Sequence, residues 1–409
     1  MIRSCKRNMA RLLRALTGRT SGRKPQNRPT EAPGHRIPLL IDCLESRTLL
    51  SAAGPITITR GGTYQGDWQS LNAKIPAVRI RTSEPVIIEN STIRSRGILI
   101  DASGFNANLT VRDTSGYGLN PNVNGQRAGR FLDVDGFSNV VVSNNYLEGT
   151  AGIYLARYKG NHTAKQTITV LGNVAKNIDG RMSNGKGGYL NKGNDDDYVQ
   201  FFQVNGAHHL RGAEVAWNQV TNEPGKSLVE DNINIFDTTG TADSRFVIHD
   251  NYIQGAYPID PAKDRNYTGG GIMVSDVNSS FISAYDNQVI DTTNYGIAIS
   301  SGHDNEFYDN RIVSAGMLPD GRKIKAQNVG AYIWNQSGKS GFTHNVGHDN
   351  VIGWVGSGGR NDWWTPDAAS WNNNQAMSGK VELATVQGEW TIWQNKLAQD
   401  GMSVGLEKA

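Results

Sequence analysis

One inserted stretch of the sequence places basic side chains beside a run of acids. Residues 177–197 contain Lys192, which is followed closely by Asp195, Asp196 and Asp197. A lysine can remove the proton next to a carboxylate, and a cluster of aspartates can bind Ca²⁺, which stabilises developing negative charge. We therefore expect Lys192 to be a catalytic base and the three aspartates to be metal ligands, with Ca²⁺ as the cofactor.

A second set of polar residues recurs at matched positions, each close to an apolar residue of a short strand. Four of them could join the lysine in catalysis: Arg157, Asp133, Asp135 and Asp237. Others carry groups that suit the binding of a polar substrate: Tyr154, Gln203, Asn205, Asn234, Arg181 and Arg265. The last two lie in long insertions, at residues 177–197 and 254–270, and insertions of that length usually have a function.

The acids also allow a different chemistry. Two carboxyl groups held roughly 5 to 9.5 Å apart can cleave a glycosidic bond, one as the acid and the other as base or nucleophile. Asp133 with Asp135, or residues 195–197 with Asp237, could form such a pair. Both chemistries therefore stay open at this stage.

The strands that must position these residues form an internal repeat. An apolar-x-apolar segment recurs at irregular spacing, and we expect its first residue to point inward at Ile98, Leu132, Ile153, Phe202, Ile233, Ile272 and Ile297. Successive side chains of a strand point to opposite faces, so the following residues, from Asp133 to Asn234, form an outward column. Repeated strands separated by loops of variable length are typical of a solenoid.

A recurring asparagine marks the turn after the second strand of each repeat. It occurs at Asn145, Asn173, Asn218, Asn251, Asn287, Asn310 and Asn350. Asparagine tolerates a left-handed backbone, and its amide can hydrogen-bond the equivalent asparagine of the next coil. The pattern therefore predicts an asparagine ladder that links the turns.

Stacked strands with asparagine turns, over residues 56–360, resemble the right-handed parallel β-helix proteins of the pectate-lyase-like superfamily. The resemblance implies an all-β fold, a single-stranded right-handed parallel β-helix of about eight or more coils. It also implies that a glycan lies along the outer face of one strand stack. In several families of this fold Lys or Arg serves as the base and Ca²⁺ holds the substrate.

The first 53 residues differ from the rest in charge. They hold eleven Lys and Arg against three acids, which gives them a net charge of +8. Because the whole chain has a net charge of +3, the remaining residues have a net charge of −5. A nucleic-acid partner is therefore not expected for the folded part. Residues 44–52, LESRTLLSA, resemble the LEPRxLLSA motif of planctomycete surface and secreted proteins, with Ser46 where proline is usual. The resemblance implies an exported or cell-surface protein.

The sequence suggests three parts. We expect a basic export segment at residues 1–53, the β-helix at 54–360, and a Trp-rich segment at 361–409 that caps or flanks the helix. Six of the nine tryptophans lie between residues 354 and 393, and their rings would also suit sugar binding. Both cysteines lie in the first part, so no disulfide framework is expected in the body.

These observations together predict a carbohydrate-active protein. We expect an exported polysaccharide lyase that cleaves an acidic glycan by β-elimination. The alternatives are a glycoside hydrolase on the same fold and a non-catalytic protein that binds glycan or builds the cell surface. The expected partner is a polysaccharide, and we expect a monomer with neither a nucleic-acid partner nor a transmembrane segment, because no run of about 18 apolar residues occurs.

Overall fold

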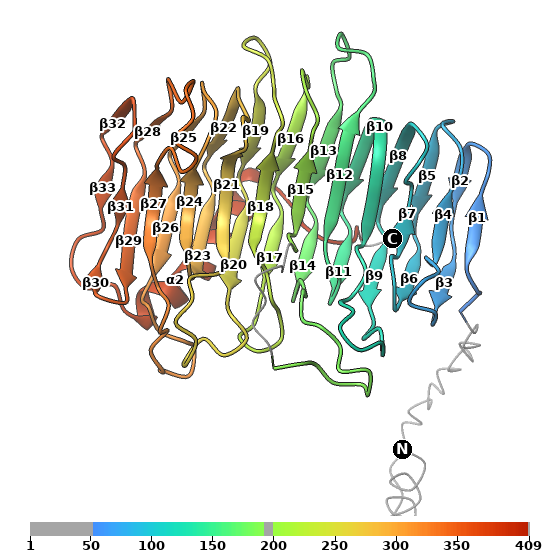
Figure 1. Cartoon of the computed structure of the whole chain (residues 1–409), viewed down its shortest axis with the longest axis horizontal. Coiled ribbons are helices and arrows are strands. Elements are labelled where there is room, and N and C mark those ends of the chain that lie inside the picture. Colours follow the sequence, from blue (N-terminus) through green and yellow to red (C-terminus); the bar gives the residue numbers. More distant parts are fainter. Residues whose placement is uncertain (1–51, 192–198, 408–409) are drawn as a thin grey trace, which may run out of the picture. The chain divides into compact units, whose positions relative to one another are not determined.

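The computed structural model describes residues 52–191 and 199–407, which form a parallel β-helix (Figure 1). Its strands lie in three parallel stacks. Stack 1 contains β1 (Ile56–Ile58), β4 (Val78–Ile80), β7 (Ile100–Asp101), β10 (Leu132–Ser143), β12 (Ile153–Tyr158), β15 (Phe202–Asn205), β18 (Asp231–Phe236), β21 (Gly270–Asp276), β24 (Tyr295–Ile299), β27 (Val329–Ile333) and β31 (Trp363–Trp364).

Stack 2 contains β2 (Gly62–Tyr64), β5 (Val86–Glu89), β8 (Ala107–Arg112), the second half of β10, β13 (Ile168–Leu171), β16 (Ala213–Ala216), β19 (Phe246–His249), β22 (Ile282–Tyr285), β25 (Glu306–Tyr308), β28 (Val346–His348) and β32 (Ser370–Asn372). Because β10 belongs to both stacks, stacks 1 and 2 form a single sheet.

Stack 3 is a separate sheet. It contains β3 (Asp67–Ser70), β6 (Thr92–Ser95), β9 (Ser115–Gly118), β11 (Tyr146–Glu148), β14 (Val174–Lys176), β17 (Gln219–Thr221), β20 (Tyr252–Ala256), β23 (Gln288–Thr292), β26 (Arg311–Ser314), β29 (Val351–Gly356) and β33 (Gln375–Ala376), with β30 (Gly359–Arg360) antiparallel to β29. One strand from each stack makes a coil, and the described residues contain eleven coils, numbered here in chain order.

The register of stack 1 follows the apolar repeat of the sequence. Leu132 pairs with Ile153, and the same row continues through the predicted inward residues of the later coils as far as Ile297 and then Ala331. These side chains are buried along the axis. The prediction for the preceding coil is wrong by two residues, because Ile100 and not Ile98 pairs with Leu132. Ile98 is only half-buried, whereas Leu99 and Ile100 are both fully buried.

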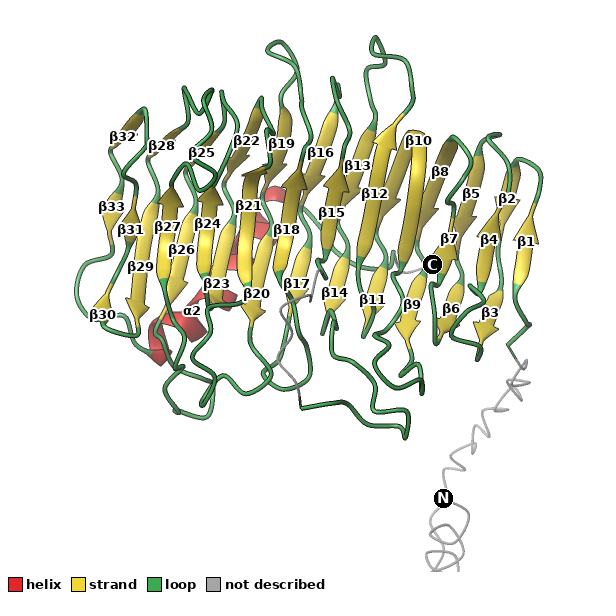
Figure 2. Cartoon of the chain, viewed as in Figure 1, coloured by secondary structure: helices red, strands yellow, loops and turns green. Residues whose placement is uncertain are grey.

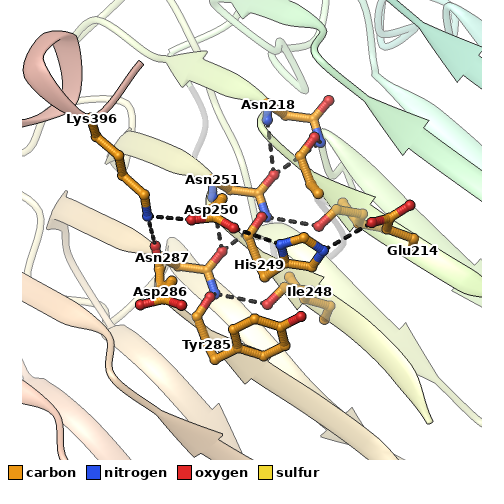
Figure 3. A network of polar contacts seen from close by, with 12 residues as sticks. Glu214, Asn218, Ile248, His249, Asp250, Asn251, Tyr285, Asp286, Asn287 and Lys396 are labelled. Carbon is orange, nitrogen blue, oxygen red and sulfur yellow. Dashed lines mark hydrogen bonds and ion pairs between the residues drawn. The ribbon is translucent and has the colours of Figure 1, made fainter. Parts of the chain in front are cut away.

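The predicted asparagine ladder is present in full. Each side-chain amide from Asn145 to Asn350 donates a hydrogen bond to the amide oxygen of the next asparagine, at 2.8 to 3.0 Å, and Asn374 extends the ladder by one position. Figure 3 shows its central part around Asn251. The left-handed backbone belongs to the residue before the asparagine, such as Asp250 at φ 51° or Asp286 at φ 53°. The asparagine itself therefore satisfies backbone groups, while its neighbour makes the turn.

A histidine that contacts two carboxyl groups lies beside the ladder on the outer face of stack 2 (Figure 3). His249 Nδ1 lies 2.7 Å from Asp250 Oδ2, and its Nε2 lies 3.0 Å from Glu214 Oε1. Burial alone lowers the pKa of His249, but the hydrogen bonds with Asp250 and Glu214 outweigh it and raise the pKa to about 9. The ring also stacks on Tyr285, with centroids 4.8 Å apart.

Strand pairing continues past the expected end of the solenoid at residue 360. Trp363 and Trp364 pair with Ala331 and Tyr332, and residues 370–372 and 375–376 extend the other two stacks. Part of the Trp-rich segment therefore forms coil 11. The rest contains a helix, α2 (Leu383–Asp400), which the sequence analysis did not anticipate.

Helix α2 packs against the outer face of stack 3 and lies behind the strands in Figure 2. Val386, Trp393 and Leu397 lie on its buried face. Buried Glu389 accepts hydrogen bonds from Arg311 Nε and Nη2, each at 2.7 Å. The helix ends at Gly401, which has a left-handed backbone with φ 63°. Apolar packing and a buried ion pair thus attach the helix to the solenoid.

The segment after α2 returns toward the first coils. Gly405 N donates to Gly172 O at 2.7 Å in coil 5, and Glu407 N donates to Asp113 Oδ1 at 3.2 Å in coil 3. In the part of the chain that the structure describes, no helix is both long and apolar enough to cross a membrane.

Candidate active site

The predicted outward column is present on stack 1. Asp133 pairs with Tyr154, Tyr154 with Gln203, and Gln203 with Asn234, so these four residues occupy one position on coils 4 to 7. Asn205 lies two residues further along its strand and hydrogen-bonds the Tyr154 hydroxyl. The sequence pattern therefore located the face, although the pairing does not show what these residues do.

The predicted catalytic residues of coils 4 and 5 are tied to one another. Arg157 Nη2 hydrogen-bonds Asp135 Oδ2, and the Arg157 side chain is otherwise exposed. Burial raises the pKa of Asp133, and the nearby Arg130 guanidinium opposes this rise. That guanidinium lies 4.6 Å from the centre of the Tyr154 ring. This part of the face is an ion-paired surface.

The remaining predicted residues are spread over other parts of the chain. Asp237 lies after β18, with Oδ2 3.9 Å from His208 Nε2. Arg181 pairs with Asp179 at 2.8 Å and covers the Tyr189 ring, so it stabilises its own insertion. Arg265 is exposed in the other insertion. The predicted base Lys192 and the predicted metal ligands Asp195, Asp196 and Asp197 lie outside the described residues.

A cavity with a volume of about 940 Å³ lies further along stack 1, over coils 7 to 10. The insertion at residues 254–270 forms one wall of it, as its length suggested. Seventeen residues line it: Leu228, Glu230, Asp231, Pro258, Ile259, Asp264, Asn266, Tyr267, Thr268, Gly269, Met273, Asp276, Asn294, Tyr295, Tyr332, Gln336 and Ser337. Four of these are acids and none is Lys, Arg or His.

Three carboxyl groups line the same part of the cavity, and the charge of each one interacts with those of the other two. Asp231 is buried and accepts hydrogen bonds from the Tyr295 hydroxyl and, at 2.9 Å, from Asn234 Nδ2. Asn234 also hydrogen-bonds Asp276, so its amide joins the two aspartates. Gln200 Nε2 donates to Glu230 Oε2 at 2.7 Å. Asn234, a predicted substrate-binding residue, therefore holds the carboxyl groups of Asp231 and Asp276 in position.

The surroundings raise the pKa values of all three acids, and that of Glu230 to about 8. Burial raises the pKa of Glu230, and the neighbouring Asp231 and Asp276 raise it further, while Gln200 and Arg127 partly oppose the rise. Burial also raises the pKa values of Asp231 and Asp276. Glu230 has both other carboxyls as neighbours and is half-exposed to the cavity. It is thus the group best placed to hold a proton that it can donate.

Gly270 makes this arrangement possible. It pairs with Asp231 on one side and with Tyr295 on the other. A Cβ at this position would lie 2.2 Å from Asp231 Oδ1 and 2.5 Å from the Tyr295 hydroxyl oxygen. Only glycine therefore leaves room for the hydrogen bond between Tyr295 and Asp231 across the intervening strand.

The sequence analysis did not select Glu230 and Asp231 because it looked only at residues after each inward apolar position. These two acids precede Ile233, at the entry to β18. Asp276 ends β21, where a register shift between β18 and β21 places it opposite Phe236. One feature of the sequence could have identified these acids: Glu230 and Asp231 directly precede a buried strand, and the long insertion at residues 254–270 follows in the same coil.

A metal would need several ligands close together. Among the described residues, no group of three or more His, Cys, Asp or Glu side chains is placed to hold a metal ion. In comparisons with known proteins, no protein-family model matches the chain, and neither a curated protein nor a solved structure matches it. The geometry of the site therefore carries the functional argument.

Proposed function

We propose that the protein is a glycoside hydrolase that uses Glu230 as its general acid and Asp276 as its nucleophile or base. The observation that carries this proposal is the acidic cavity, in which these two half-exposed carboxyls lie near each other above the buried Asp231. Protonated Glu230 would protonate the glycosidic oxygen as its bond to the anomeric carbon breaks. The Asp276 carboxylate would attack that carbon or activate the water that does.

The charge of the cavity suggests a neutral glycan. The residues that line it include four acids and no Lys, Arg or His, while Arg127 lies close enough to Glu230 to lower the pKa of that carboxyl. A polyuronate would therefore bring its negative charges next to carboxyl groups. The elimination reaction expected from the sequence depends on Lys192 and the aspartates beside it, and it remains a second proposal for a different part of the chain.

The place of action is also a proposal. The LESRTLLSA segment supports export to the cell surface. The parallel β-helix with its asparagine ladder supports a structural relationship to the pectate-lyase-like proteins. We propose an exported monomer that acts on a polysaccharide.

The experiment is a cleavage assay on the purified full chain. Xylan, mixed-linkage β-glucan and mannan serve as neutral substrates, and polygalacturonate and alginate as acidic ones, each with Ca²⁺ or with a chelator. We expect new reducing ends from a neutral glycan and no unsaturated product. Ultraviolet absorbance of unsaturated ends would instead indicate elimination. Neither signal across the panel would leave glycan binding as the better account.

Variants test the residues. Glu230→Gln and Asp276→Asn should each lower kcat by about 10² to 10⁴ while the thermal unfolding midpoint changes little. Glu148→Gln, on β11 of stack 3, is the matched control and should keep full activity. Wild-type activity should fall at alkaline pH as Glu230 loses its proton. An active Glu230→Gln variant would remove the proposed acid.

A further inference from the structure

A second cavity adjoins the acidic one at its C-terminal side. It has a volume of about 430 Å³ and shares Asn294, Tyr332 and Gln336 with the first cavity. Its other lining residues are Asn328, Val329, Trp334, Asn361 and Trp364. The two cavities therefore form one continuous surface over stack 1.

Two tryptophans form the open side of this second cavity. The Trp334 side chain is 36% exposed and that of Trp364 is 48% exposed, with ring centroids 5.1 Å apart. Trp364 pairs with Tyr332 and so occupies the same outward column as Asn234. Large aromatic rings left open to solvent beside a cavity provide an apolar surface for a ligand to cover.

The rest of the lining is polar without charge. It offers side-chain amides from Asn294, Asn328, Gln336 and Asn361, and Asn328 Nδ2 donates to Asn294 Oδ1 at 3.2 Å. None of the lining residues is charged. Aromatic faces with a few amide donors and acceptors match a neutral sugar ring, which has an apolar face of C–H groups and a rim of hydroxyls.

The distance between the two sites indicates the length of the ligand. Asp231 is in register with Gly270, Tyr295 and Val329, so Asp231 on coil 7 lies three coils before β27, which Trp334 directly follows. Three coil spacings of about 4.8 Å give roughly 14 Å. A single sugar ring cannot reach from the acids to the tryptophans, whereas a short oligosaccharide can.

We propose that the cavity formed by Trp334, Trp364 and Tyr332 is a subsite that binds a neutral sugar residue of the glycan chain held at Glu230 and Asp276. This inference rests on the proposed function, because it assigns the same chain to both cavities. It makes the substrate an oligosaccharide or polysaccharide with several residues on one side of the cleaved bond.

The test measures binding apart from cleavage. Titration calorimetry on the Glu230→Gln protein uses xylohexaose, cellohexaose and mannohexaose, with hexagalacturonate as the anionic comparison. We expect at least one neutral hexasaccharide to bind, with Trp364→Ala or Trp334→Ala weakening its binding about tenfold or more. Trp364→Phe keeps a ring and should retain most of the affinity. Trp390→Ala, which removes an equally exposed tryptophan on α2, is the control.

The outcomes separate the two proposals. Two outcomes would overturn the proposed subsite, even if the wild type cleaves the glycan. One is that neither tryptophan variant weakens the binding of a neutral hexasaccharide, and the other is that no neutral hexasaccharide binds. Binding that either tryptophan variant weakens supports the subsite, and if the wild type then cleaves nothing, the hydrolase proposal alone fails.

Discussion

Replacement of an internal asparagine of the ladder is expected to destabilise the solenoid by about 4 kcal/mol. Asn251 is fully buried, and its amide oxygen accepts hydrogen bonds from Asn218 N at 3.0 Å and Asn218 Nδ2 at 2.9 Å. Its amide nitrogen faces Val215 O, His249 O and Asn287 Oδ1, each at 2.9 Å.

The magnitude follows from these contacts. The amide nitrogen has two hydrogens for three acceptors, so the five contacts amount to about four hydrogen bonds at roughly 1 kcal/mol each. Asn251→Ala also leaves the Asn218 N–H without its acceptor in a buried place, which adds to the loss. Asn374→Ala is the matched control. It removes the last, half-buried member of the ladder, where water can replace the lost partners, and should cost about 1 kcal/mol.

The assay is urea unfolding followed both by far-ultraviolet circular dichroism and by tryptophan fluorescence, which should give coincident transitions in the wild type. Both variants are compared at neutral pH. If Asn251→Ala loses no more stability than Asn374→Ala, the ladder contributes nothing beyond what water supplies, and the reasoning from buried hydrogen bonds is refuted.

Two further predictions concern the outer faces. Hydrogen bonds with Asp250 and Glu214 raise the pKa of His249 to about 9, so the stabilising effect of His249 should be fully present below pH 6.5 and disappear as pH rises through about 9. Thermal unfolding of the wild type and of His249→Gln across this pH range measures the effect. A difference in stability between the two proteins that does not change with pH would contradict the prediction. Glu389→Ala leaves Arg311, whose side chain is 30% exposed, without the partner that α2 supplies. Because water can solvate the freed guanidinium, attachment of the helix should weaken by about 1.5 to 3 kcal/mol. Hydrogen exchange of α2 measures this loss, and unchanged protection of the helix would show that the ion pair does not hold it.

Much of the fold could be predicted from the sequence because strand periodicity and turn chemistry agree. A buried strand alternates at every second residue, and the asparagine of each turn marks where the next coil starts, so the row from Leu132 to Ala331 could be aligned correctly. The alignment failed at Ile98-Leu99-Ile100, where three apolar residues in succession fit either register. Backbone pairing with the next coil decided the register there.

Helix α2 and the acid cluster were harder to predict for different reasons. The helix contains Gly388 and two tryptophans, and its buried face includes the charged Glu389, so its apolar pattern is interrupted. The acids come together through the stacking of coils 7 and 8 and through a register shift in β21. A linear pattern gives the face on which a residue lies, but it does not show which neighbours surround it on the next coil.

The return of the chain through α2 changes how the whole solenoid unfolds. In a plain stack each coil contacts only its neighbours, so coils can fray one at a time from either end. Here Glu389 binds coil 9 at Arg311, while Glu407 reaches coil 3 at Asp113, 294 residues away in sequence. Loss of an interior coil therefore also strains this long-range closure, which couples distant coils into one cooperative unit. Since α2 follows all the strands of the described residues, this closure forms only after these eleven coils have been synthesised.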